Sequence, residues 1–545
     1  MKVLGINAVF HDSAAALVAD GKIVAAAEEE RFSRRKHGKE CNPFTTWELP
    51  ALSAAWCLQE AGIDADELDA VAYSYDPALA LRTNGDVTAA QWEGLRTLYV
   101  QHAEGFLRSV FPKLPRNSVR FVRHHVAHAA SAYLAGPHRT CSVIVADGRG
   151  ENASFLAGRV RDGNLEVLAV QHLPHSLGLR YEEATTQLGF RRSSDEYKVM
   201  GLAAYGKPVH LDYFRRKITV NGNGGFYADG IDWDALCPKR DKDQPFKQQH
   251  ADLAASLQIR LEEVLLELAQ RLYDQTHDKV LVMAGGVALN CVANARLARE
   301  GPFAEIWVQP AAGDAGTALG AALYVSHAAG DRVEPMQSAA LGRHFSEQQV
   351  ESFLREAHVG YERPANIAEA AAEIIARDGV VAWFQGKSEY GPRALGHRSL
   401  LAHPGFAANL DRLNHIKGRE EFRPVAPMVL NDRAAAIFEG QLPSPYMLFT
   451  HRVKRDWRER IVAAVHVDGT ARVQTVDRAE EALVAEMLEA FERRTGTPVV
   501  INTSLNTAGR PMVDEPRDAL ECFGSAPIDA MAIGPFLIRR SGVAA

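Results

Sequence analysis

Two β-hairpin patterns with the same internal spacing lie far apart in the chain, and they restrict the fold more than any other feature. In the first pattern Asp20-Gly21 follows Gly5, and in the second Asp162-Gly163 follows Asp147 at the same distance along the sequence. Asp-Gly flanked by apolar strands is a strong hairpin signal. The strand-like segments are 2–6, 14–18 and 23–27, and then 142–146, 153–160 and the run that ends at Val170. The pattern predicts an internal structural repeat, and two unrelated hairpins are the alternative.

Helical and strand-like segments alternate through the rest of the chain, which indicates an α/β or α+β protein. With 545 residues, the chain is too long for one ordinary core. Apolar periodicity lapses at 328–344, so we expect two domains, 1–340 and 341–545. Helices are predicted at 52–61, 91–110, 251–277 and 367–377, and further strands at 119–122, 280–284, 306–308, 380–384 and 498–501.

Composition argues against several classes of protein. A formal net charge of −7 gives no support to a broad nucleic-acid or membrane-binding surface. No apolar run approaches the length of a membrane span, and His11-Asp12 interrupts the first segment before a signal peptide could form. The six cysteines form no Cys-x-x-Cys pair, which is typical of reduced thiols. We therefore expect a cytoplasmic protein without nucleic-acid or membrane partners.

His124 and His128 are four residues apart at the start of a predicted alanine-rich helix, so they share a helix face and can reach one metal ion. Asp147 and Asp314 each come after an apolar strand and among glycines, where a carboxylate can face a cleft. Two imidazoles with carboxylates suit Fe²⁺ or Zn²⁺. Capping or core histidines are the alternative. His125 diverges from this face, and we expect it to be structural.

Two glycine-rich turns, at 284–290 and 313–317, connect buried strands to helices. Glycine lets the backbone approach a phosphate, and a helix N-terminus favours anions. Neither turn matches a P-loop or the dinucleotide fingerprint, and either alone could be an ordinary tight turn. As a pair beside the hairpin repeat, they indicate an actin-like nucleotide fold. The mixed-charge segment 28–37 offers Arg31 and Lys36 to an anion, or is a solvated helix end.

The second domain is dense in fixed positive charge at 387–399 and 417–424. Arginine guanidinium groups bind phosphate or carboxylate bidentately. Asn502-Thr503-Ser504 adds amide and hydroxyl groups at a predicted strand end. The pattern favours a triphosphate together with a second phosphorylated substrate. RNA binding competes, but it would require aromatic residues among the basic ones, and these are sparse.

These blocks together resemble the NodU/CmcH family of O-carbamoyltransferases, and they cover nearly the whole chain. The Gly-Pro-Arg-Ala-Leu-Gly-x-Arg-Ser block at 391–399 is the most specific. The resemblance implies an N-terminal actin-like ATPase domain similar to tRNA threonylcarbamoyl-transfer enzymes, and a C-terminal YrdC-like α/β domain. The YrdC-like domain would join the carbamate of carbamoyl phosphate to ATP, giving carbamoyl-adenylate and pyrophosphate. The N-terminal domain would then transfer the carbamoyl group to a small-molecule hydroxyl.

The resemblance also implies roles for individual residues. Metal ligands would be His124, His128, Asp147 and Asp314, with Fe²⁺ as the expected metal, and ATP with Mg²⁺ and carbamoyl phosphate would be bound. Catalytic roles would belong to His11, Asp12, Asp195 and Lys198, and imidazole suits proton transfer near neutral pH. Nucleotide or phosphate contacts are expected from Lys36, Gly285, Gly286, Asn290, Gly313, Gly316, Lys387, Arg393, His397, Arg398, Ser399, Lys417, Arg419, Arg423, Asn502, Thr503 and Ser504.

Three other functions compete with this one. The fused YrdC-like half and the lack of a broad basic surface argue against a tRNA threonylcarbamoylation enzyme. A hydrogenase-maturation carbamoyltransferase would need acylphosphatase and Cys-x-x-Cys zinc modules, and a non-enzymatic binding protein would not turn over ATP. Alanine and arginine usage indicates a GC-rich bacterial genome, so we expect an antibiotic or another secondary metabolite as acceptor, bound near 76–105 and 180–192. A homodimer is expected from the family alone.

Overall fold

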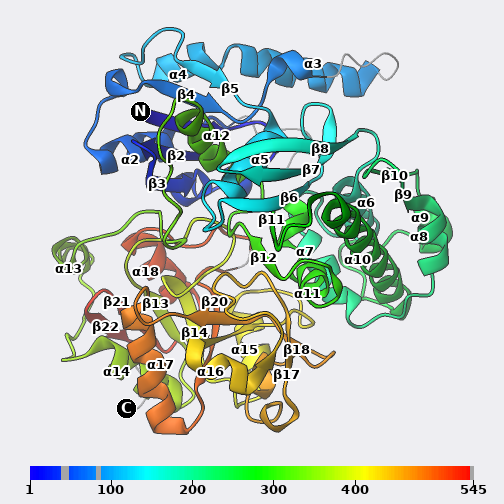
Figure 1. Ribbon diagram of the computed structural model, residues 1–545. Coiled ribbons are helices and arrows are strands. Elements are labelled where there is room, and N and C mark those ends of the chain that lie inside the picture. Colours follow the sequence, from blue (N-terminus) through cyan, green and yellow to red (C-terminus); the bar gives the residue numbers. More distant parts are fainter. Residues whose placement is uncertain (39–47, 81–86, 508, 541–545) are drawn as a thin grey trace. The chain divides into compact units, whose positions relative to one another are not determined.

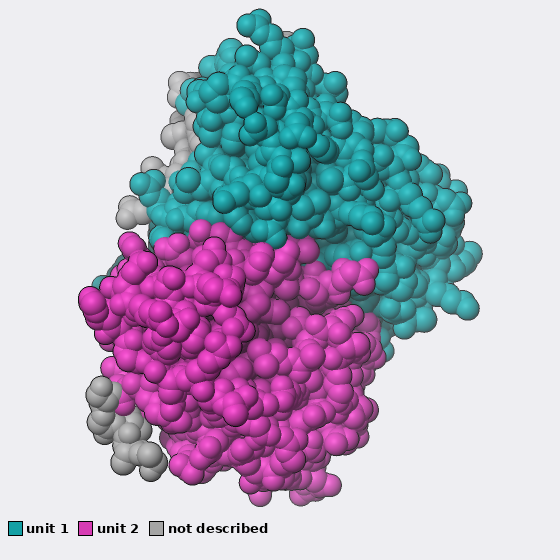
Figure 2. Space-filling model, turned by 90° about the vertical axis from the view of Figure 1, so that its left-hand side faces the viewer, with its two compact units in different colours: residues 1–336 teal, residues 337–545 magenta. Residues whose placement is uncertain are grey.

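The computed structural model describes residues 1–38, 48–80, 87–507 and 509–540, and it divides the chain into two compact units, Met1–Met336 and Gln337–Ala545 (Figures 1 and 2). Each unit combines sheets with helices, which confirms the mixed α/β class. The expected boundary at 340 falls just inside the second unit. Part of the predicted acceptor loop at 76–105 lies outside the described residues.

The first unit contains two five-stranded sheets with the same topology. Three antiparallel strands come first in each sheet. A fourth strand then pairs in parallel with the first of the three, and a fifth pairs in parallel with the fourth. One sheet has the order β3(Lys22–Glu28), β2(Ala14–Ala19), β1(Lys2–Asn7), β4(Ala70–Tyr73), β5(Val119–Phe121), and the other β8(Asn164–His172), β7(Ala153–Arg161), β6(Thr140–Ala146), β11(Val280–Ala284), β12(Glu305–Val308). The predicted internal repeat is confirmed, and it includes the parallel strands that follow each hairpin.

Alternating side chains explain how the first sheet is covered. Leu4, Ile6 and Leu17 point to one face, where they pack in a core with residues of helices α2 (Ala51–Ala61) and α4 (Ala103–Val110). The single helix predicted at 91–110 is in fact two helices, α3 (Val87–Gln101) and α4. The chain leaves helical geometry at His102, whose φ is −97° and ψ is 7°. The apolar periodicity of the sequence does not indicate this break.

Helix α12 (Ala315–Ala328) follows the second sheet, and it packs closely against helix α5 (His124–Tyr133), which follows the first (Figure 1). The contact requires a small residue, because a Cβ on Gly320 would lie 1.8 Å from the carbonyl oxygen of Ala127. This close approach brings the first turns of the two helices together. The two helices therefore bring residues from the two halves of the repeat next to each other.

Apart from the four-residue α1 (Glu30–Ser33), the remaining α-helices described in the first unit follow the second hairpin. They are α6 (Leu177–Gln187), α7 (Glu196–Ala203), α8 (Leu211–Lys217), α9 (Trp233–Leu236), α10 (Gln248–Thr276) and α11 (Cys291–Glu300), and a short β9–β10 ribbon (Ile218–Val220, Phe226–Ala228) lies among them. Helix α10 is the amphipathic helix predicted at 251–277, and its apolar residues are buried. No helix in the described part of the chain is both long and apolar enough to span a membrane.

The second unit is built on a seven-stranded mixed sheet. Its order is β19(Gln474–Val476), β15(Ala426–Leu430), β20(Val499–Ser504), β14(Arg398–Ala402), β13(Val381–Phe384), β21(Ala530–Ile533), β22(Phe536–Arg539). Val381 and Trp383 belong to a core with α14 (Ile367–Ala376) and α17 (Ala482–Thr495), whereas Ala382 and Phe384 belong to a second core with α13 (Glu347–Glu356), α15 (Ala408–Ile416) and α18 (Pro516–Ser525). Asn502-Thr503-Ser504, expected to follow a strand, lies within β20.

Candidate functional site

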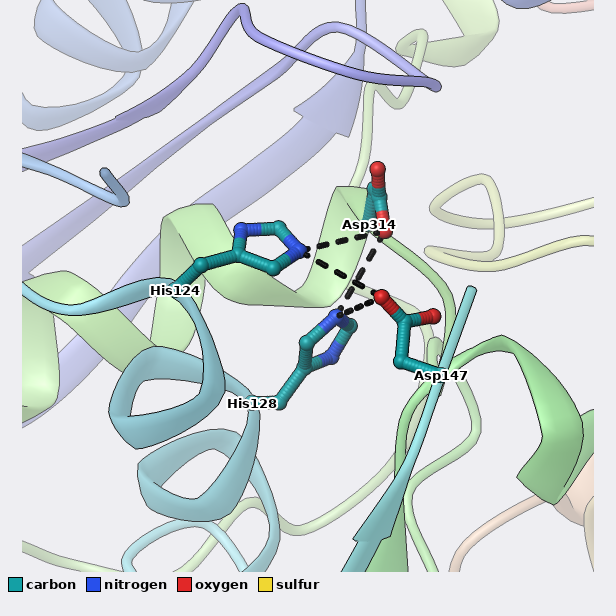
Figure 3. Close-up of side chains that lie close together, drawn as sticks. All are labelled: His124, His128, Asp147 and Asp314. Atoms are coloured by element: carbon teal, nitrogen blue, oxygen red, sulfur yellow. Dashed lines mark ion pairs between the residues drawn. The ribbon is translucent and has the colours of Figure 1, made fainter. Parts of the chain in front are cut away.

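Four side chains from three separate regions of the sequence meet in the first unit (Figure 3). His124 and His128 come from α5, Asp147 follows β6, and Asp314 begins α12. All four are almost completely buried. Their facing nitrogen and oxygen atoms lie within 4.8 Å of one another. The structure thus assembles the four residues that the sequence suggested as metal ligands.

The distances in this cluster fit ligands of one metal ion better than they fit hydrogen bonds. His124 Nε2 lies 3.5 Å from Asp314 Oδ1 and 3.7 Å from Asp147 Oδ2, and His128 Nε2 lies 3.5 and 3.9 Å from the same atoms. Donors bound tetrahedrally at about 2.1 Å are about 3.4 Å apart, whereas hydrogen bonds are shorter. Among the described residues, neither Nε2 has a hydrogen-bond partner. These buried nitrogens without hydrogen bonds, together with two carboxylates, fit a divalent transition metal.

Neighbouring groups fix the orientation of these side chains. The Ser74 carbonyl oxygen lies 3.0 Å from His124 Nδ1, which must therefore carry the hydrogen and leave Nε2 facing the cluster. Asp147 Oδ1 accepts a hydrogen bond of 2.9 Å from the Gly286 amide. Gly285 must be glycine, because its φ is +92° and a Cβ would lie 2.3 Å from the Ala146 carbonyl oxygen. The first glycine-rich turn therefore holds Asp147 in place.

The cluster concentrates opposite charges in a buried place. Burial raises the pKa of Asp147 and of Asp314, but the imidazoles outweigh it, so both carboxyl groups have lowered pKa values. Burial lowers the pKa of the neighbouring His125 to about 3, so this ring is neutral near pH 7. His125 Nε2 lies 4.0 Å from Asp147 Oδ2.

A second polar cluster joins His11 and Asp12 to two residues that the sequence did not single out. His37 Nδ1 lies 2.7 Å from Asp12 Oδ1, and His37 Nε2 lies 2.9 Å from Ser194 Oγ. His11 Nδ1 lies 2.9 Å from Asp12 Oδ2. Asn7 donates hydrogen bonds to the carbonyl oxygens of His11 and Asp12, which ties this turn to β1. The predicted catalytic pair is thus one half of a larger hydrogen-bonded cluster.

The other two predicted catalytic residues form an ion pair with each other. Lys198 Nζ lies 3.1 Å from Asp195 Oδ2, and the same carboxylate accepts a hydrogen bond from the Arg191 amide. Both residues lie at the start of α7, but it is Ser194, one residue earlier, that reaches His37. Lys36 lies in a short 3₁₀ turn beside His37, and it is partly buried.

Asn290 differs from the expectation that it contacts a nucleotide. Asn290 Oδ1 accepts hydrogen bonds from the Ala293 amide and from Gln258 Nε2. Asn290 therefore caps helix α11, and both lone pairs of its Oδ1 are used. In the second glycine-rich turn, a Cβ on Gly316 would lie 2.0 Å from the Ala311 carbonyl oxygen, whereas one on Gly313 would approach only side-chain atoms, at 3.7 Å or more. Gly313 is therefore the open position of that turn.

Arg398, for which a phosphate contact is predicted, makes many contacts within the fold. Its side chain is fully buried, and it stacks on Phe384 with 3.7 Å between the guanidinium carbon and the ring centre. It donates hydrogen bonds to backbone carbonyl oxygens of Arg343, Gln385, Gly386, His397 and Asp514. These contacts use the guanidinium group inside the fold, where Arg398 stabilises the loop.

Glu389 organises the arginine-rich loop from within. Its Oε1 accepts hydrogen bonds from the amides of Leu395, His397 and Arg398 at 2.7 to 3.1 Å. Burial raises the pKa of Glu389, but the charge of His397 and these amides outweigh burial, and the pKa is lowered. The conspicuous block of this loop is thus folded around a buried carboxylate, and Arg393 remains partly exposed.

The other predicted residues of the second unit are likewise either buried within the fold or partly exposed. Lys417 Nζ donates to Ser504 Oγ at 2.9 Å, so the structure brings two of the predicted phosphate contacts together. Asn502 Nδ2 donates to Gln474 and to the Ala394 carbonyl oxygen within the sheet. The buried side chains are His397, Ser399, Lys417 and Asn502, and the partly exposed ones are Lys387, Arg393, Arg419, Arg423, Thr503 and Ser504.

Several residues near the site were missed by sequence reasoning. They are Asn7, His37, Ser74, Glu151 and Ser194. Glu151 Oε1 accepts the amides of both Asp76 and His124, which joins the ends of two elements of the first half. His37 and Ser194 have no distinctive spacing in the sequence, so no motif could have identified them.

Comparison with known proteins covers both units. The family model described as "Carbamoyltransferase N-terminus" matches residues 2–323, and "Carbamoyltransferase C-terminus" matches residues 372–540. Nodulation protein NolNO of Sinorhizobium fredii is 40% identical over 98% of this chain and 80% of its own. An uncharacterized protein of Synechocystis is 36% identical over 99% of this chain and 97% of its own.

Similarity to solved structures is much weaker. Full-length HypF in its phosphate- and nucleotide-bound form is 14% identical, with a TM-score of 0.35 over 60% of this chain and 55% of that chain. A TM-score this low supports no assignment of fold or function. The actin-like and YrdC-like names for the two units therefore remain predictions.

Proposed function

The chain belongs to the carbamoyltransferase family, and from this premise we propose that it places a carbamoyl group on a hydroxyl of a small molecule, with ATP and carbamoyl phosphate as co-substrates. That it is a carbamoyltransferase follows from the family. The proposal adds a carbamoyl-adenylate intermediate, made in the second unit and used in the first. The observation that carries it is the buried His124, His128, Asp147 and Asp314 cluster within the duplicated domain.

In the first unit, the four residues of the cluster would hold a divalent metal, for which Fe²⁺ is our proposal. Such an ion polarises a carbonyl or phosphate oxygen by Lewis acidity. Gly313 leaves space beside the start of α12, where an anionic group meets a helix N-terminus. His11 and Asp12 in the turn after β1, with His37 bound to Asp12, would take up the proton of the acceptor hydroxyl.

In the second unit, the partly exposed basic residues bind the phosphates. Arg393 and Arg423 are partly exposed and lie in the same two segments as the buried Glu389 and Lys417. Their fixed charge would balance the phosphate groups of ATP and carbamoyl phosphate as bonds rearrange. Arg398 and Glu389 set the shape of the loop. Mg²⁺ accompanies ATP in this proposal.

The acceptor is proposed as a secondary metabolite such as an antibiotic. A cytoplasmic location, a homodimer and the absence of nucleic-acid and membrane partners also belong to the proposal. Neither the tRNA-modifying nor the non-enzymatic alternative fits the match to carbamoyltransferase models at both ends of the chain.

The experiment measures pyrophosphate release from ATP with and without carbamoyl phosphate, in the absence of any acceptor. We expect release that depends on carbamoyl phosphate and falls at least about tenfold in Arg423→Gln, because one phosphate-binding charge is lost. Arg433→Gln is the control, since Arg433 is an exposed residue of α16 (Asn431–Ile437). Arg398→Ala is unsuitable, because it removes a buried support of the fold. Pyrophosphate release that does not depend on carbamoyl phosphate would contradict the proposal.

A further inference from the structure

Three buried polar side chains connect the two halves of the repeat in the first unit. Thr317 lies in the first turn of α12, Ser74 follows β4, and Asn7 ends β1. All three residues are completely buried. Thr317 Oγ1 lies 2.9 Å from Ser74 Oγ, and Ser74 Oγ donates a hydrogen bond of 3.1 Å to Asn7 Oδ1. We call this row of side chains the Thr317 link.

The hydrogen bonds of Asn7 fix the direction of the Thr317 link. Asn7 Nδ2 donates to both carbonyl oxygens of His11-Asp12, at 2.7 and 3.0 Å. Asn7 Oδ1 can only accept, so the hydroxyl hydrogen of Ser74 points to it. The hydrogen of Thr317 is then shared between Ser74 Oγ and the Asp314 carbonyl oxygen, which lies 2.6 Å from Thr317 Oγ1.

The Thr317 link reaches two of the four residues of the metal cluster. The Ser74 carbonyl oxygen lies 3.0 Å from His124 Nδ1, which leaves Nε2 of this ring facing the cluster. Thr317 Oγ1 donates to the carbonyl oxygen of Asp314, whose Oδ1 lies 3.5 Å from His124 Nε2 (Figure 3). His124 belongs to α5 and Asp314 begins α12. Two ligands from different helices are therefore connected through two hydroxyl groups.

Packing alone does not explain a hydroxyl group at Thr317. Helix α12 lies directly against β1, because a Cβ on Gly5 would lie 1.9 Å from the Ala318 carbonyl oxygen. Valine has nearly the shape of threonine and would fill the same space in this contact. A buried polar network adds something that an apolar side chain cannot, since it selects one arrangement of the groups that it joins. The groups joined here are those that carry the metal ligands.

On the basis of the metal site proposed above, we infer that Thr317 is a positioning residue of that site and acts through Ser74. The two hydroxyl groups hold the start of α12 against the end of β4. Asp314 and His124 therefore keep the separation that one metal ion requires, before the ion binds.

The Thr317 link also extends from the metal ligands to the turn after β1. Asn7 receives the hydrogen of Ser74 and holds both carbonyl groups of His11-Asp12. A metal ion that fixes its ligands thus also restrains this turn. Because coupling between two equilibria is reciprocal, a turn held in place favours metal binding in return. Metal occupancy therefore determines how well the turn is ordered.

The test removes the hydroxyl group of Thr317 and keeps its shape, in Thr317→Val, or keeps the hydroxyl group, in Thr317→Ser. Thr185→Val is the matched control, because Thr185 is equally buried and donates its hydroxyl to the Tyr181 carbonyl oxygen within α6. Zn²⁺ affinity of the full-length proteins is measured by competition with a chromophoric chelator, and stability of the metal-free proteins by urea unfolding. We expect Zn²⁺ affinity to fall at least about tenfold in Thr317→Val and less than about threefold in Thr317→Ser. Thr185→Val should lose stability as Thr317→Val does and keep its Zn²⁺ affinity.

Hydrogen exchange of residues 8–13, with and without Zn²⁺, tests the connection to the turn. Zn²⁺ should slow exchange there in the wild type and in Thr317→Ser. In Thr317→Val, exchange should stay fast even at saturating Zn²⁺, because the Thr317 link is broken. Slow exchange in zinc-saturated Thr317→Val would show that the link does not restrain the turn.

The affinity measurements separate the remaining alternatives. Equal losses of Zn²⁺ affinity in Thr317→Val and Thr185→Val would reduce Thr317 to a structural role. Unchanged affinity in Thr317→Val would exclude it as a positioning residue. A wild-type protein that binds neither Zn²⁺ nor Fe²⁺ would instead contradict the metal site of the proposed function.

Discussion

Asp147 uses its two carboxylate oxygens for different partners. Oδ1 accepts the Gly286 amide, and Oδ2 faces the imidazoles of the cluster. The glycine-rich turn, which the sequence suggested for nucleotide binding, therefore also orients a ligand of the proposed metal. Such orienting hydrogen bonds contribute to metal affinity because they fix the ligand before the ion binds.

Removing one member of the cluster should weaken metal binding. His128→Gln replaces a buried imidazole whose Nε2 lies 3.5 Å from Asp314 Oδ1. We expect the affinity for Fe²⁺ or Zn²⁺ to fall at least about 100-fold, because a ligand is lost outright. Metal content after dialysis, measured by atomic emission, checks this, with His172→Gln as control. Equal metal content in both variants would exclude His128 as a ligand.

Glu196 makes the stability of the protein fall as the pH rises. Burial, and then the charge of Glu182, raise its pKa from 4.5 to about 7. Between these values the folded protein holds a proton that the unfolded chain has lost, so stability falls as pH rises through this range. The penalty is fully present above about pH 7 and absent below about pH 4.5.

Glu196→Gln should therefore raise the free energy of unfolding by about 2 kcal/mol at about pH 8 and leave it almost unchanged at about pH 4. Urea unfolding of both proteins at the two pH values measures the difference. A stabilisation of equal size at both pH values would show that the effect does not come from ionisation.

At the scale of elements, the contact between α5 and α12 depends on Gly320. A Cβ there would overlap the Ala127 carbonyl oxygen, which belongs to the helix that carries both histidines. Gly320→Val should destabilise the first unit by at least about 3 kcal/mol and lower metal content, because α12 must move away with Asp314. Thermal unfolding and metal analysis test this.

Gly105 in α4 offers a matched control, because a Cβ there meets nothing within 4 Å. Gly105→Ala should stabilise by about 0.5–1 kcal/mol through a smaller loss of chain entropy. If Gly320→Val retained both stability and metal, close helix packing would not be what assembles the cluster.

At the scale of the whole molecule, each of the two units has its own sheets and its own buried cores. Arg398 belongs to the core of the second unit, where it holds carbonyl groups from several segments. Arg398→Ala leaves those acceptors buried without donors, and we expect a loss of about 3–5 kcal/mol in stability.

Hydrogen exchange followed by mass spectrometry locates this effect. Exchange should increase in β13, β14 and β20, while α5 and α12 of the first unit stay protected, because their core does not include Arg398. Arg433→Ala, on an exposed pair with Glu492, should change neither unit. Faster exchange throughout both units would show that they unfold as one.

The sequence by itself determined the repeat, the class and the metal-ligand candidates. Asp-Gly turns between apolar strands act locally, and a spacing of four places His124 and His128 on one helix face, so both can be recognised without knowledge of the fold. The apolar periodicity of α10 likewise predicted its buried face. The break between α3 and α4 at His102 could not be predicted, because nothing in the apolar pattern marks it.

Only the tertiary structure decided which polar residues face a ligand. Arg393 and Arg398 look alike in sequence, yet Arg398 is used by backbone carbonyls and Arg393 is partly exposed. Asn290 caps a helix, and His37 meets Ser194 from a distant segment. Residue type and spacing give the chemistry that a side chain can perform. Burial and partners brought together by chain folding decide which chemistry remains available, and these depend on contacts far apart in the sequence.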